Sequence, residues 1–113
     1  MIVKHEELEK RREKLQKELA RAVDELRKMG AERIILVGSM AEGDIGPFSD
    51  IDLVVVMRTK ERFLDRLKAA YGKIQPSVAM DILIYSPDEL DDLRETSAFV
   101  IHALEKGRVL YAA

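Results

Sequence analysis

The sequence predicts a small α/β (α+β) domain, in which helices pack on a mixed β-sheet of about four strands. Short runs of β-branched and apolar residues alternate along the chain with longer segments whose apolar residues recur at helical spacing. The expected order is helix, strand, strand, helix, strand, helix, strand. The chain has 113 residues, of which 47% are hydrophobic, so we expect one domain over residues 1–113 with a core of its own.

The first expected element is a long helix over about residues 5–29, ended by Gly30. Oppositely charged residues such as Glu13 and Lys17 stand four positions apart, which stabilises an exposed helix face. We expect water to cover the charged face, and a partner-binding role for part of it stays open. The apolar face comprises Leu8, Leu15, Leu19, Ala22, Val23, Leu26 and Met29.

Two strands and their connection follow this helix. Residues 33–37 form a short β-branched run that stops at Gly38, and residues 39–42 allow one helical turn at most. Two glycines and a proline punctuate residues 43–49, which predicts a loop. Residues 50–57 are expected to form the second strand, whose continuously apolar centre favours burial on both faces. A connection of this length inside a compact domain is usually functional.

The middle of the chain predicts one more helix and one more strand. Residues 59–71 place apolar side chains at helical spacing, and Gly72 is expected to end that helix. Residues 77–85 are rich in apolar and β-branched residues and are expected to form the third strand.

The last expected helix has a strong start signal. Ser86 suits the N-cap, Pro87 the first helical position and Glu89 the third, where its side chain can complete a capping box. This helix is expected to end at Lys106, before Gly107, and a break near Thr96 could divide it. A last short strand is expected over residues 108–111.

Composition and motifs exclude several classes of protein. Cysteine is absent, which rules out a disulfide scaffold, a thiolate zinc site and a cysteine nucleophile together. No apolar run approaches the roughly 18 residues of a membrane span, and the charged N-terminus is unlike a signal peptide. We therefore expect a cytoplasmic protein without membrane contact. The net charge of −2 argues against direct nucleic-acid binding, and neither a P-loop nor a dinucleotide-binding glycine motif is present.

Three aspartates in apolar strands are the most informative residues. Asp50 and Asp52 stand two positions apart, so their side chains should share one face, roughly 6–7 Å apart along the strand. Asp81 lies inside the apolar third strand and reaches the same site if that strand neighbours the second. Buried carboxylates need a positive partner, and the nearest cation in sequence, Arg58, lies at the far end of the strand.

A divalent cation would meet this need. Magnesium prefers carboxylate oxygens together with substrate phosphates, and three carboxylates suffice to hold two metal ions. The alternative is that Asp50 and Asp81 stand at strand ends as solvated or capping residues.

Gly38 and Ser39 directly follow the first strand. Glycine lets the backbone approach a ligand closely, and Ser39 opens a helical turn whose free N–H groups could bind phosphate. The alternative is that Ser39 and Glu42 form a helix capping box.

The spacing of these residues completes a pattern. A Gly-Ser pair, ten further residues and Asp-Ile-Asp make up residues 38–52. Residues 37–54 resemble the polymerase-β-type nucleotidyltransferases, and specifically the minimal nucleotidyltransferase (MNT) family of prokaryotes. The resemblance continues to Asp81 and the last strand, and so covers about residues 20–111.

The resemblance implies a role for each residue of the pattern. Gly38 and Ser39 would hold the phosphates of the nucleotide. Asp50 and Asp52 would bind magnesium, and Asp81 would bind metal and help to activate the acceptor hydroxyl. The implied reaction is the Mg²⁺-dependent transfer of AMP from ATP, with pyrophosphate leaving.

The resemblance also implies a partner. The chain has no evident acceptor domain, so the acceptor is expected to be another macromolecule or a neighbouring subunit of a homo-oligomer. In the family, the usual partner is a HEPN-domain RNase toxin, and some members add AMP to a toxin tyrosine. Relatives often carry Arg where this chain has Glu42, so a cation that could touch the triphosphate is missing. The alternative function is therefore a weak or inactive antitoxin that neutralises its partner by contact alone.

Overall fold

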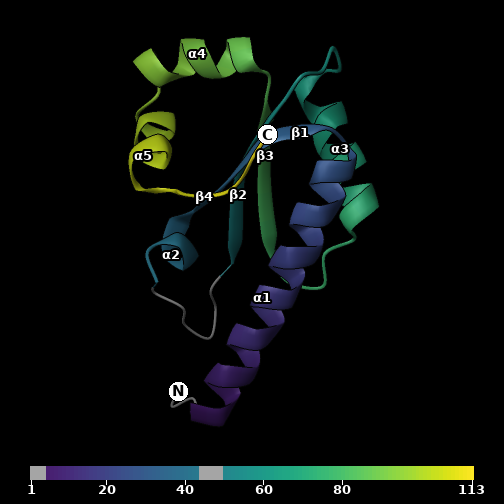
Figure 1. Ribbon diagram of the computed structural model, residues 1–113, viewed down its shortest axis with the longest axis vertical. Coiled ribbons are helices and arrows are strands. Elements are labelled where there is room, and N and C mark those ends of the chain that lie inside the picture. The colour runs from purple at the N-terminus through teal and green to yellow at the C-terminus, as the bar shows by residue number, and fades with distance from the viewer. Residues whose placement is uncertain (1–4, 44–49) are drawn as a thin grey trace.

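A computed structural model describes residues 5–43 and 50–113 of the chain (Figure 1). The predicted loop over residues 43–49 lies outside the described residues from residue 44 onward. The elements, in chain order, are α1 (His5–Lys28), β1 (Ala31–Val37), α2 (Gly38–Ala41), β2 (Ile51–Met57), α3 (Phe63–Ile74), β3 (Met80–Tyr85), α4 (Pro87–Thr96), α5 (Ala98–Lys106) and β4 (Arg108–Ala112).

The four strands form one mixed sheet in the order β3-β2-β1-β4. β1 runs antiparallel to both β2 and β4, whereas β2 and β3 run parallel. The predicted fold class, a small α+β domain with a mixed four-stranded sheet, is confirmed. Because β2 and β3 run parallel, their first residues lie together at the same end of the sheet.

Helices cover the two faces of the sheet unequally. One face packs against α1 and α3 and holds the larger core cluster, which includes Leu26, Ile34, Leu53 and Ile82. α4 and α5 lie on the opposite face. The fully apolar centre of β2 has this double cover, as the sequence predicts.

The cover on the α4–α5 face stops before the start of β2. Val56 packs with Leu90 of α4 and Val100 of α5, and Val54 packs near Ala103 of α5. The next residue of β2 on this face, by strand alternation, is Asp52, which is partly exposed, and its strand partner Asp81 on β3 is exposed. The face is therefore closed over the end of β2 and open over its beginning.

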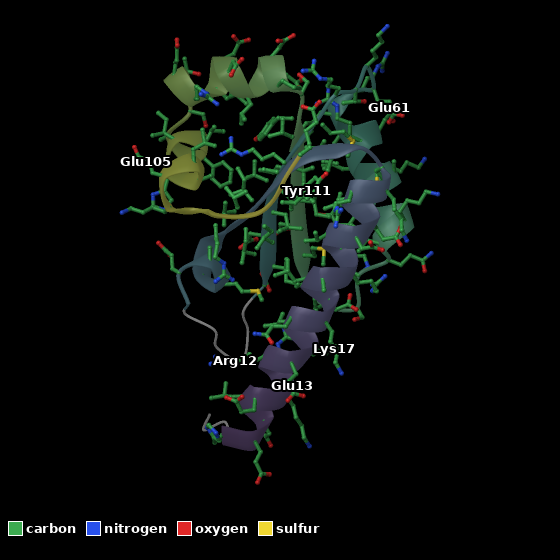
Figure 2. All side chains as sticks on the ribbon, in the orientation of Figure 1. Arg12, Glu13, Lys17, Glu61, Glu105 and Tyr111 are labelled. Carbon is green, nitrogen blue, oxygen red and sulfur yellow. The ribbon has the colours of Figure 1, made fainter. Side chains whose placement is uncertain are left out.

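Helix α1 is buried only along its second half. Its buried residues begin at Leu15 and continue to Leu26, whereas the first ten residues of the helix are exposed or partly exposed. This first part extends beyond the sheet, and Glu13 and Lys17 project from the helix away from the sheet (Figures 1 and 2). No helix in the described part of the chain is long and apolar enough to cross a membrane.

Helix α3 differs from the prediction at both ends. It begins at Phe63 rather than residue 59, and it continues through Gly72 to Ile74. Gln75 ends it in the left-handed conformation, with a φ of 47°. Arg21 of α1 donates hydrogen bonds to the carbonyl oxygens of Ile74 and Gln75, so a distant side chain satisfies the carbonyls that a helix end leaves free.

The start of α4 and the break after it agree with the prediction. Ser86 and Glu89 form a complete capping box, with Pro87 in the first turn. Ser97 separates α4 from α5 and caps the second helix, because its hydroxyl accepts a hydrogen bond from the backbone N–H of Val100.

Side chains of α3 lie along the outer edge of β3. The Tyr71 hydroxyl donates to the carbonyl oxygen of Met80 and accepts from the backbone N–H of Ile82, both at 3.0 Å. Arg66 donates to the carbonyl oxygen of Ile84 at 3.1 Å and also forms an ion pair with Glu89 of α4. Backbone groups on the unpaired side of β3 thus find partners in a helix.

Candidate functional site

Asp52 and Asp81 lie side by side at the open end of the α4–α5 face. The third strand does neighbour the second, and the parallel register pairs Asp52 directly with Asp81. Both side chains point to the same face, because paired residues of neighbouring strands share a face. The two carboxyl groups are neighbours, because the charge of Asp81 acts on Asp52.

The environment of Asp52 opposes its negative charge. Burial raises the pKa of the Asp52 carboxyl above its ordinary value, and the charges of Asp81 and Asp50 raise this pKa further. A cation bound between these carboxyl groups would relieve the repulsion and would favour their ionised forms.

The carboxylates are less buried than the sequence predicts. Asp52 and Asp50 are partly exposed, and Asp81 is exposed. The strands themselves are core strands, but α5 leaves their first residues uncovered on this face. The expectation of three buried acids is therefore wrong, because α5 does not cover the first residues of β2 and β3. The open face instead gives solutes access to the pair.

Asp50 stands one residue before β2 rather than inside it. Its charge acts on Asp52, yet residues 5–43 and 50–113 contain no group of three or more His, Cys, Asp or Glu side chains arranged to hold a metal ion. The structure therefore brings Asp52 and Asp81 together, and Asp50 does not complete a three-ligand group with them.

Two carboxylates still suit magnesium. This ion is usually held by one or two carboxylates, and waters and substrate phosphates complete its coordination. No ion pair among the described residues involves Asp50, Asp52 or Asp81. Arg58 is engaged at the other end of β2, where its Nε lies 2.7 Å from Oε1 of Glu32. The donor set and the repulsion between the acids thus fit a divalent cation.

Gly38 lies against the Asp52 carboxylate. Val37, the last residue of β1, pairs with Asp52, so the chain turns into α2 directly beside it. Gly38 has a φ of 76°, and a Cβ built on it would overlap Oδ2 of Asp52. Both the backbone conformation and the close approach therefore require glycine.

Ser39 lies in the single turn of α2 and is partly exposed. The alternative capping box is wrong, because the N-cap is Val37 and no side chain caps this helix. Glu42 is the exposed C-cap residue of the same turn, four residues after Gly38.

A cavity of about 490 Å³ contains the acid pair and extends across the outer edge of β3. Two aromatic residues of its lining, Tyr71 and Phe99, are not among the candidate site residues that the sequence predicts. The hydroxyl of Tyr71 bonds to the β3 edge through tertiary packing, which no local sequence pattern indicates. Phe99 is 49% exposed. The sequence does indicate an exposed apolar side chain here, because four consecutive apolar residues begin α5 and one helix face cannot bury them all. The lining residues are Val37, Gly38, Asp52, Leu53, Leu67, Tyr71, Asp81, Ile82, Leu83 and Phe99.

Comparison with known proteins identifies the family. Residues 16–79, more than half of the chain, match the family model described as a nucleotidyltransferase domain. The chain therefore belongs to the nucleotidyltransferase domain family. The matched stretch contains Gly38, Ser39, Asp50 and Asp52, and it stops two residues before Asp81.

A solved structure has a similar fold. It is described as "Crystal structure of the toxin-antitoxin with AMP-PNP", and the TM-score is 0.57 at 19% sequence identity, over 83% of this chain and 73% of that chain. At this identity the likeness concerns the fold. A comparison with curated proteins gives no significant match.

Proposed function

We propose that this chain is a magnesium-dependent nucleotidyltransferase that transfers AMP from ATP to a hydroxyl group on a protein partner. The observation that carries the proposal is the parallel pairing of Asp52 with Asp81 beside Gly38, in a chain of the nucleotidyltransferase family. We further propose that the partner is a HEPN-domain toxin and that this chain is its antitoxin. The toxin–antitoxin structure with AMP-PNP supports the antitoxin role, because its fold is similar. The HEPN type of the partner is proposed from the resemblance of residues 37–54 to the MNT family.

The residues of the site have distinct tasks in this mechanism. Gly38 gives the phosphates close access to the backbone, and Ser39 holds them through its hydroxyl and the first N–H groups of α2. Asp52 and Asp81 hold magnesium, with Asp50 adding negative charge. Bound magnesium would supply neutralisation of the phosphate charge.

The reaction is an in-line displacement at the α-phosphorus. The acceptor oxygen forms a bond to this phosphorus, and the bond to the oxygen that bridges the α- and β-phosphates breaks, so pyrophosphate leaves. Asp81 accepts the proton of the incoming hydroxyl. Its exposure suits this task, because a group on a second protein must reach it.

An intact-mass measurement tests the proposal. The chain is incubated with ATP, magnesium and a HEPN-domain protein, and the mass of the partner is recorded. We expect a gain of one or more AMP units with the wild type and none with Asp52→Asn. Removing a magnesium ligand should raise the activation barrier by several kcal/mol, which slows the reaction more than about a thousandfold. Asp92→Asn, at an exposed acid of α4, is the matched control and should transfer normally.

Glu42 favours a second candidate, an antitoxin that acts by binding alone. An exposed carboxylate lies where relatives often present a cation to the triphosphate, and it would repel that group. If the wild type and Asp52→Asn silence the toxin equally and no mass changes, this second function holds and the transferase proposal is wrong.

A further inference from the structure

Phe99 is an exposed aromatic side chain in the wall of the candidate site. It is the second residue of α5, it is 49% exposed, and it lines the same cavity as Asp52 and Asp81. Its neighbours in the helix, Val100 and Ala103, pack on the sheet, so the helix is anchored without it. An apolar ring left open to solvent beside two carboxylates suits a ligand that is both aromatic and charged.

The strand order gives this cavity a direction. Gly38 lies on the β1 side of Asp52, and Asp81 lies on the β3 side. An in-line displacement puts the leaving pyrophosphate and the incoming hydroxyl on opposite sides of the phosphorus. With the phosphates at Gly38 and the proton acceptor at Asp81, this axis crosses the strands from β1 toward β3.

The nucleoside is bonded to the α-phosphorus and extends to one side of the line that joins the incoming and leaving oxygens. The sheet closes the direction beneath the α-phosphate, so the sugar and base extend over the α4–α5 face. On that face the cavity wall beyond the acids contains Leu83 and Phe99. Phe99 therefore stands on the side of the reaction axis that the nucleoside occupies.

We propose that Phe99 is the platform on which the base of the bound nucleotide stacks, and so is a positioning residue for the nucleoside. This inference rests on the proposed function. Stacking of a base on an aromatic side chain strengthens binding by about 5- to 150-fold and tolerates different bases, because each base has a π-face. Phe99 therefore contributes affinity for purine nucleotides in general, and ATP and GTP should depend on it alike.

Two probes separate stacking from general damage to the site. The affinities of ATP and of inorganic tripolyphosphate, each with magnesium, are measured by calorimetry for the wild type, Phe99→Ala and Phe99→Trp. We expect Phe99→Ala to weaken ATP binding by about 5- to 150-fold and to leave tripolyphosphate binding unchanged. Phe99→Trp should restore ATP binding. Leu64→Ala, at an apolar side chain of α3 that is 74% exposed and outside the cavity, should change neither.

The outcomes are distinct for the two proposals. If Phe99→Ala leaves ATP binding unchanged, or weakens both probes equally, the stacking role is wrong while the transferase proposal stands. If the wild type binds neither probe, or Asp52→Asn binds both as tightly as the wild type, the proposed function fails and the stacking role falls with it. Thermal melting of each variant confirms that the protein is folded.

Discussion

Replacing Gly38 by alanine tests how closely the turn after β1 approaches Asp52. The new Cβ would overlap Oδ2 of Asp52, and the residue would have to keep a φ of 76°. A left-handed conformation costs a non-glycine residue roughly 1–2 kcal/mol. Moving the Asp52 side chain off its rotamer adds about 0.5–1.5 kcal/mol. We therefore expect Gly38→Ala to destabilise the protein by about 1.5–3.5 kcal/mol.

Gly43 provides a matched control. Its φ is 78°, and a Cβ built on it meets no atom of residues 5–43 or 50–113 within 4 Å. Gly43→Ala should therefore cost only the backbone term of roughly 1–2 kcal/mol. The difference between the two variants measures the contact with Asp52 apart from backbone strain.

Urea unfolding at neutral pH, with chelator present, gives the free energies of unfolding. A double-mutant cycle of Gly38→Ala with Asp52→Ala then tests the cause, because removing the carboxylate removes the overlap. We expect Gly38→Ala to cost about 0.5–1.5 kcal/mol less in the Asp52→Ala background. Equal costs for Gly38→Ala and Gly43→Ala, with no coupling in the cycle, would refute the reasoning.

Further variants test other parts of the structure. Gly107→Ala should destabilise the protein strongly in urea unfolding, since its Cβ would overlap a backbone carbonyl oxygen. Gly72→Ala, inside α3 and with no atom of the described residues within 4 Å of the new Cβ, should instead stabilise the protein by roughly 0.5–1 kcal/mol. The opposite order would contradict the packing of α5 on β1. Asp52→Asn should not lower the melting temperature of the metal-free protein, and magnesium with ATP should raise that temperature for the wild type only; a clear loss of metal-free stability would instead indicate a structural role. The hydrogen bond from Arg21 lowers the pKa of Glu18 to about 2, so this carboxylate stabilises the fold above its ordinary pKa near 4.5 and loses that effect as the pH falls toward 2. Glu18→Gln should therefore be less stable than the wild type at pH 7 and nearly equal near pH 2, and a constant difference across that range would rule out the ion pair as the cause.

Local signals predicted most of the elements. The start of α4 was predictable because a capping box and an N-terminal proline act within four residues. The end of α3 was not, because Gly72 continues the helix and Arg21, 53 residues away from Ile74, helps to end it. A glycine stops a helix only where no tertiary contact stabilises a later end.

The candidate acids are visible in the sequence, whereas their arrangement is not. Asp52 and Asp81 stand out because they interrupt apolar strands, and Asp50 stands out because it directly precedes one. Asp81 lies beside Asp52 because β2 and β3 pair in parallel in this register. The sequence alone does not determine that these two strands are neighbours. The exposure of Asp81 depends on where α5 stops covering the sheet, and Phe99 enters the site through the same packing.

The hydrogen bonds from α3 to the outer edge of β3 restrict how a partner can dock. An open edge strand invites another chain to add a strand, which leads to assembly or to aggregation. Tyr71 already engages Met80 and Ile82, and Arg66 engages Ile84, so an incoming strand would first have to displace a helix. Because this edge borders the cavity, the partner in the proposed reaction would present its hydroxyl to Asp81 from a loop, a helix or a flexible tail, and not by adding a strand beside β3.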